Sequence, residues 1–198
     1  TVSLMLGIDS NQITTYQGNT PRSIIDYINA VGRETFHAWR SELGWARDSR
    51  NDYFMPTRGT YQRVGLETTL PGSTVEYYKL NYQISKYWPI IPSLVINTRA
   101  EVGYGDSYGK DTSRVVTESD GTQRVITASG LPFFENFYAG GTNSVRGFED
   151  NTLGPRSEIT NGYRNGQPLG GSLKTVGSVE AFFPRLFDSP SARVSAFV

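Results

Sequence analysis

The sequence contains no cysteine and only one histidine, His37, in 198 residues. The absence of cysteine excludes a disulfide framework and a thiolate metal site. A lone histidine without a surrounding carboxylate pattern is typical of a structural residue. Two neighbouring carboxylates, Glu118 and Asp120, are interpreted as solvated residues of a polar hairpin. Because no phosphate-binding loop or metal-ligand spacing occurs either, we expect no catalytic residue, metal or cofactor, and no enzyme activity.

The chain also lacks an excess of either charge and lacks long apolar runs. Lysine and arginine together number 19, and so do aspartate and glutamate. This balance provides no strong electrostatic field for nucleic acid, so no nucleic-acid partner is expected. No apolar run approaches the roughly 20 residues that a membrane-spanning helix requires.

Apolar and polar residues instead alternate over long stretches, with the two-residue period of a β-strand. In residues 75–88, for example, Tyr78 and Leu80 alternate with Lys79 and Asn81. Tyrosine and glycine enrichment also suits a β-rich chain. We predict an all-β chain of about seven strands, the last one incomplete. The predicted strands are residues 1–9, 35–45, 61–70, 75–88, 94–104, 172–183 and 193–198.

The predicted strands are roughly 10–14 residues long, whereas strands of globular proteins usually have about 5–6 residues. One face is apolar, with tyrosine and tryptophan near the strand ends, and the other carries charged and amide side chains. A soluble sandwich would have shorter strands. A transmembrane β-barrel requires about 9–11 tilted residues per strand, aromatic girdles and a polar interior. The pattern therefore predicts an antiparallel transmembrane β-barrel.

The connections agree with this fold. Short turns are predicted at 48–59, 71–74, 89–93 and 184–191, and long loops at 10–34 and 105–171. Although the 71–74 reversal falls on the long-loop side, short turns on one rim and long loops on the other are typical of outer-membrane barrels. Within the long loops, Pro21 and Gly32 mark the ends of a short helix. Asp120-Gly121 marks a hairpin.

The loop at 105–171 carries a distinctive run. It reads Pro132-Phe133-Phe134-Glu135-Asn136-Phe137-Tyr138-Ala139-Gly140-Gly141, then Val145-Arg146-Gly147-Phe148 and Leu153-Gly154-Pro155-Arg156. This run resembles the signature loop of the Omp85 superfamily, and is most similar to the branch that assembles other outer-membrane β-barrels. Residues 53–59, 76–79 and 103–106 also agree with the family. The resemblance covers essentially the whole chain, except that residues 112–129 look like an added hairpin.

The resemblance implies a barrel of about 16 strands preceded by periplasmic POTRA domains. Residues 1–198 are then expected to be a middle-to-late portion of one outer-membrane β-barrel domain. The POTRA domains and the first and last barrel strands are expected to lie outside the chain, in keeping with termini that fall within predicted strands. The loop at 105–171 is expected to be the sixth extracellular loop, directed into the lumen. The implied location is the bacterial outer membrane.

The resemblance also implies that the motif arginine, Arg146, pairs with acidic residues on the inner barrel wall. The alternation places Glu180 on the polar face, so we predict an Arg146–Glu180 pair. A second acidic partner is expected just beyond Val198. Gly147 is expected to permit a close backbone approach, and Phe148 to pack against the wall. The predicted motif-loop residues are Gly140, Gly141, Val145, Arg146, Gly147 and Phe148. A solvated surface arginine is the alternative interpretation of Arg146.

The implied function is that of the core subunit of the outer-membrane β-barrel assembly machinery, which folds and inserts outer-membrane proteins without nucleotide. The implied partners are outer-membrane lipids, unfolded outer-membrane protein clients, and accessory lipoproteins that bind through the POTRA domains. A related Omp85 transporter that secretes or translocates a passenger protein is the alternative. A passive porin-like channel is a third interpretation, which a lumen plugged by a docked Arg146 disfavours.

Overall fold

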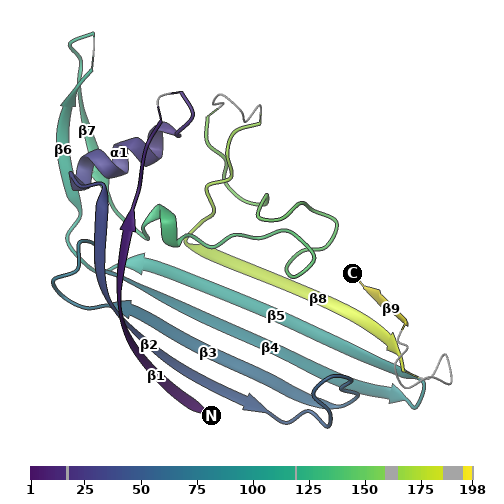
Figure 1. Ribbon diagram of the computed structural model, residues 1–198. Coiled ribbons are helices and arrows are strands. Elements are labelled where there is room, and N and C mark those ends of the chain that lie inside the picture. Colours follow the sequence, from purple (N-terminus) through teal and green to yellow (C-terminus); the bar gives the residue numbers. More distant parts are fainter. Residues whose placement is uncertain (17, 119, 159–164, 185–193, 198) are drawn as a thin grey trace.

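The computed structural model describes residues 1–16, 18–118, 120–158, 165–184 and 194–197. Residues 185–191 of the predicted turn, and residues 193 and 198 of the predicted final strand, lie outside the described residues. Within them, seven strands form one antiparallel sheet in the order β1-β2-β3-β4-β5-β8-β9, and β6 and β7 form a separate two-stranded sheet (Figure 1). The elements are β1 Val2–Gln12, α1 Arg22–Val31, β2 Thr35–Asp48, β3 Gly59–Thr69, β4 Tyr77–Ile91, β5 Leu94–Ser107, β6 Thr112–Thr117, β7 Gln123–Ala128, η1 Phe133–Glu135, β8 Leu173–Phe183 and β9 Val194–Phe197.

The register of the large sheet aligns apolar side chains in rows across the strands. One such row contains Leu4, Leu43, Leu66, Leu80, Tyr104 and Leu173. All six side chains are exposed, which leaves this face of the sheet without a packed hydrophobic layer. Residues next to them in sequence point to the opposite face, because successive side chains of a strand alternate. The predicted division into an apolar face and a polar face is therefore present in the structure.

The two ends of the sheet differ in their connections (Figure 1). At one end, β4 and β5 are joined through residues 92–93, and β2 and β3 through residues 49–58. At the other end, residues 13–34 carry α1 and residues 108–172 carry β6, β7 and η1. The motif loop thus begins at the end of the sheet that carries the long connections.

The helix and the hairpin of the long connections pack against each other. Ala30 of α1 is buried together with Ile126 and Ala128 of β7. Helix α1 ends at Val31 and is capped by Gly32, whose left-handed φ of 75° allows its N–H to donate to the Ile28 carbonyl oxygen. This is the stop that the sequence predicted. In the described part of the chain, no helix has the length and apolar character needed to cross a membrane.

Charged side chains reinforce this packing. Arg124 of β7 donates two hydrogen bonds of 2.7 Å to Asp26 of α1 and one of 3.2 Å to Glu118. These acceptors raise the pKa of Arg124 above its ordinary value. Glu118 also pairs with Arg22. The interpretation of Glu118 as a merely solvated carboxylate is therefore wrong, because its charge joins the hairpin to the helix. Asp120 instead accepts a hydrogen bond of 2.9 Å from the Thr122 backbone, which closes the hairpin turn.

Candidate functional site

The motif loop crosses one face of the large sheet, above β5 and β8 in the view of Figure 1. We call this face, which carries Glu67, Lys79, Glu101 and Glu180, the inner face. The loop is folded back on itself by three isolated bridges, namely Phe137–Gly171, Ala139–Leu153 and Arg156–Pro168. These bridges provide hydrogen-bond partners for backbone groups of the loop, which lie outside the named strands.

The structure brings Arg146 and Glu180 together. The Arg146 Nη1 atom lies 3.6 Å from Glu180 Oε1, within the range of an ion pair but beyond that of a hydrogen bond. The guanidinium carbon also lies 4.3 Å from the centre of the Phe197 ring. Phe197 is the register partner of Glu180 on the neighbouring strand, so both side chains lie on the inner face. We call Arg146, Glu180 and Phe197 the tip contact. The contribution of Phe197 was not anticipated from the sequence.

Two glycines of the motif are required by close contacts. Gly140 has φ of 115°, and a Cβ atom there would lie 2.4 Å from the Glu149 carbonyl oxygen. Gly141 has φ of 92°, and its Cβ would overlap the side chain of Asp150. Both glycines therefore allow a tight reversal against residues 149–150 of the same loop.

Gly147 and Phe148 differ from their predicted roles. Gly147 has φ of 90° but open space around its Cβ position, so glycine is needed there for its backbone conformation. The expectation of a close approach at Gly147 is wrong. Phe148 is 54% exposed, so the expectation that it packs against the wall is also wrong for the described residues. Val145, by contrast, is half-buried and lines a cavity of about 150 Å³ beside the tip contact.

A second group of charged side chains contacts the same loop at Glu135, ahead of the glycine-rich motif. We call this part of the loop its start. Glu135, the last residue of η1, accepts a hydrogen bond of 3.0 Å from Arg40 Nη2 of β2. Its other carboxylate oxygen accepts one of 2.9 Å from Lys79 Nζ of β4. Arg40 also lies 2.7 Å from Asp9 and 3.4 Å from Glu67. We call Glu135, Arg40 and Lys79 the root cluster.

Sequence reasoning treated Glu135 only as part of the motif and missed these contacts. A signal was nevertheless present, since Glu135 is the only carboxylate between residues 131 and 148. The alternation of apolar and polar residues also places Lys79 and Arg40 on the polar faces of their strands. What the sequence did not provide was the order and register that bring these two strands under the start of the loop.

Two further cavities lie near the loop. One, of about 560 Å³, lies on the inner face and is lined by Arg99, Tyr87 and Arg50 as well as by the Arg146 and Glu180 side chains. The other, of about 120 Å³, lies where α1 meets the roots of the neighbouring loops. Within the described residues, no cluster of three or more His, Asp or Glu side chains is placed to hold a metal ion.

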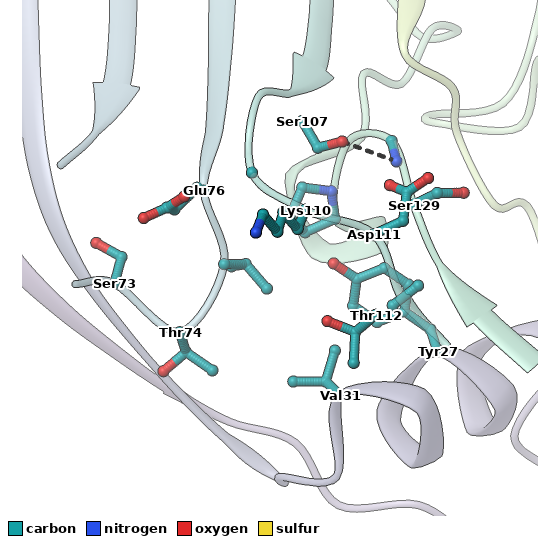
Figure 2. A pocket seen from close by; sticks show the side chains of 15 residues that line it. Tyr27, Val31, Ser73, Thr74, Glu76, Ser107, Lys110, Asp111, Thr112 and Ser129 are labelled. Carbon is teal, nitrogen blue, oxygen red and sulfur yellow. Dashed lines mark hydrogen bonds between the residues drawn. The ribbon is translucent and has the colours of Figure 1, made fainter. Parts of the chain in front are cut away.

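Figure 2 shows the smaller cavity, with Tyr27 and Val31 of α1 on one side and Glu76 and Lys110 on another. Burial raises the pKa of Tyr27 to about 12, so its hydroxyl stays protonated at neutral pH. The Tyr27 ring packs edge-on against Phe133 at a centroid distance of 5.5 Å. The helix thereby contacts the start of the motif loop.

Known proteins resemble this chain over most of its length. The Omp85 superfamily domain matches residues 1–198. Outer membrane protein assembly factor BamA of Neisseria meningitidis serogroup B is 30% identical over 194 residues, which are 93% of this chain and 22% of that protein. The sorting and assembly machinery component 50 homolog of Mus musculus is 28% identical over 161 residues, which are 80% of this chain and 29% of that protein.

The fold also matches a solved structure. The crystal structure of BamA from Haemophilus ducreyi lacking POTRA domains 1-3 superposes with a TM-score of 0.77 at 22% sequence identity. The match covers 99% of this chain and 37% of that chain. The chain thus spans less than two fifths of each of these three proteins. The predicted fold class, a portion of an antiparallel transmembrane β-barrel, is confirmed.

Proposed function

This chain belongs to the Omp85 superfamily, and from that premise we propose that it is part of the barrel of a factor that folds and inserts β-barrel proteins into the outer membrane. The Neisseria relative is named as an outer membrane protein assembly factor, and the mouse relative as a component of a sorting and assembly machinery. The location of the chain is the bacterial outer membrane.

The observation that carries the proposal is the docking of the motif loop on the inner face through Arg146. A guanidinium on a protein face is held there by groups that attract its positive charge. Glu180 supplies a carboxylate at 3.6 Å, and Phe197 supplies the face of an aromatic ring. A cation over an aromatic face is attracted by the ring quadrupole. The tip contact therefore acts as a latch between the loop and strands β8 and β9.

In this proposal the chain contributes a fixed wall and a fixed loop, and needs no nucleotide. Client strands add to the edge of a barrel through backbone hydrogen bonds, which require no chemical energy source. The clients are unfolded outer-membrane proteins, the surrounding medium is outer-membrane lipid, and accessory lipoproteins join through POTRA domains of the complete protein. The docked loop keeps the inner face in one arrangement while strands add elsewhere in the barrel.

The test is Arg146→Ala in the full-length protein. We expect a lower yield of assembled outer-membrane proteins and faster protease cleavage of the loop, with the barrel still folded by heat-modifiable gel mobility. Arg58→Ala, which removes an exposed arginine from the turn between β2 and β3, is the matched control. Unchanged assembly together with an unchanged loop would contradict the proposal. Loss of passenger secretion with normal assembly would favour the transporter alternative.

A further inference from the structure

We infer that Glu135 is a positioning residue, which fixes the start of the motif loop to strands β2 and β4 independently of Arg146. The inference rests on the proposed function, in which the loop must be held on the inner face. The loop is then held at two separate places, one at Glu135 and the other at Arg146.

The first observation is that one carboxylate joins two strands that are not neighbours. Arg40 lies in β2 and Lys79 in β4, with β3 between them in the sheet. Each oxygen of Glu135 accepts from one of the two cations, at 3.0 and 2.9 Å. Charge-assisted hydrogen bonds of this length are about twice as strong as neutral ones. Glu135 therefore joins the loop to both strands that flank β3.

The second observation is the burial of the root cluster. The side chains of Glu135 and Lys79 are only 11% and 15% exposed. The Arg146 side chain is 42% exposed. Because solvent screens buried charges less than exposed ones, the Glu135–Lys79 pair is screened less than the Arg146–Glu180 pair.

The third observation is the close contact between glycines of β5 and the residues around Glu135. A Cβ atom at Gly103 of β5 would lie 2.7 Å from the ring of Phe137, and one at Gly105 would lie 3.0 Å from Leu131. A glycine within a strand often marks such a close approach. Lys79 Nζ also lies 5.1 Å from the centre of the Phe137 ring. The same lysine thus contacts the carboxylate and the ring that flanks it.

The root cluster and the tip contact are the two anchors of the loop, and they share no partner residue. Arg146 contacts Glu180 and Phe197, at the far side of the sheet from β2. Removal of one anchor should therefore release one part of the loop and leave the other in place, because effects at sites without shared partners add.

Phenylalanines near Glu135 and near Arg146 allow protease cleavage to report on each part of the loop separately. Chymotrypsin cleaves after phenylalanine, and Phe133, Phe134 and Phe137 flank Glu135, whereas Phe148 follows Arg146. In the full-length protein in membranes, Glu135→Gln should raise cleavage at these three root sites about tenfold, the scale of one lost charge-assisted hydrogen bond. Cleavage after Phe148 should stay near its wild-type rate. Arg146→Ala should show the reverse pattern.

Two further variants test whether the effect of Glu135→Gln comes from its contact with Lys79. Glu149→Gln, which neutralises an exposed carboxylate of the same loop, is the matched control and should leave root cleavage unchanged. Lys79→Met removes one of the two cations and should raise root cleavage as well. In the double variant Glu135→Gln/Lys79→Met, the increase should be smaller than the product of the two single increases, because the two residues share one interaction. Lys79→Met also tests the contact if Glu135→Gln does not fold.

The outcomes separate this inference from the proposed function. Root sites that stay protected in both Glu135→Gln and Lys79→Met would overturn the inference, whatever happens to assembly. Root sites that open while assembly stays normal in both Glu135→Gln and Arg146→Ala would support the inference and overturn the proposed function. We expect the root sites to open and assembly to fall.

Discussion

The root cluster and the tip contact hold the same loop to the same face of the same sheet, but by different physical means. At the root, a carboxylate that is 11% exposed accepts two hydrogen bonds from cations on β2 and β4. At the tip, a guanidinium that is 42% exposed faces a carboxylate at 3.6 Å and an aromatic ring. The loop thus combines a well-buried anchor with an accessible one.

The most recognisable residue of a motif therefore need not be the one that holds it most tightly. An exposed ion pair contributes roughly 0–1 kcal/mol. A hydrogen bond to a charged group contributes roughly 1.5–3 kcal/mol, and more is lost when a buried partner is left unsatisfied. We therefore expect the Arg146 contact to break at a lower cost than the Glu135 contact.

The largest effect is expected from a substitution that displaces the start of the loop from the sheet without changing any charged residue. In Gly103→Ala, the new methyl group would lie 2.7 Å from the Phe137 ring and push it from the sheet. Overpacking of this kind costs roughly 1–3 kcal/mol. Chymotrypsin cleavage after Phe137 should rise by about tenfold or more, and cleavage after Phe148 should change little.

Gly65→Ala is the control for this change. Gly65 and Gly103 lie in one row of the inner face, joined through Asn81 of β4. The Cβ position of Gly65 has no atom within 4 Å, so alanine should be accepted there. Equal cleavage in the two variants would show that Phe137 is not seated on Gly103, and the root would then depend on Glu135 alone.

The strands were predictable because their faces are chemically different. Several strand ends were not, since alternation fades there while pairing continues. Strand β1 was predicted to end at Asp9 but runs to Gln12, which pairs with Thr35. Strand β4 was predicted to end before Pro89 but runs to Ile91, with a register shift between Pro89 and Ile91. A bulge is one of the few places where a strand accepts proline.

The candidate site was predictable only in part, for a related reason. The face of Glu180 follows from alternation within one strand, and the sequence could therefore place it opposite the loop. The partners of Glu135 depend on which strands lie side by side and in what register. Alternation says nothing about that order. The exposed position of Phe148 depends likewise on the path of the loop, which glycines at 140, 141 and 147 direct through positive φ angles.

A smaller effect should separate the two components of the tip contact. Phe197→Leu removes the aromatic face over which the Arg146 guanidinium lies, while Glu180 stays in place. Cation–π contacts at exposed sites contribute about 0.5–1 kcal/mol, so cleavage after Phe148 should rise roughly two- to fivefold. Phe197→Tyr keeps the ring and should behave as wild type. Cleavage at the root sites should not respond to either substitution, and a response there would mean that the two anchors are coupled.

The smallest effect concerns a third attachment of the loop, where Glu158 accepts a hydrogen bond from the backbone N–H of Arg22 at the start of α1. This bond holds the pKa of the Glu158 carboxyl below its ordinary value of 4.5. A carboxyl whose pKa is lowered in the folded state stabilises that state fully above its ordinary pKa, and the contribution is lost as pH falls through the folded pKa. The attachment should therefore be intact at neutral pH and weaken below about pH 4.5.

Hydrogen exchange of a peptide covering residues 22–31, corrected for the intrinsic pH dependence, measures this attachment. Protection in the wild type should fall below pH 4.5, whereas Glu158→Gln, which cannot titrate, should show a smaller fall. Glu118 also pairs with Arg22, so Glu118→Gln serves as a second reference. Because Glu158 is exposed, the change should be smaller than at either anchor. An equal loss of protection in wild type and Glu158→Gln would show that the Glu158 carboxyl is not the source of the acid response.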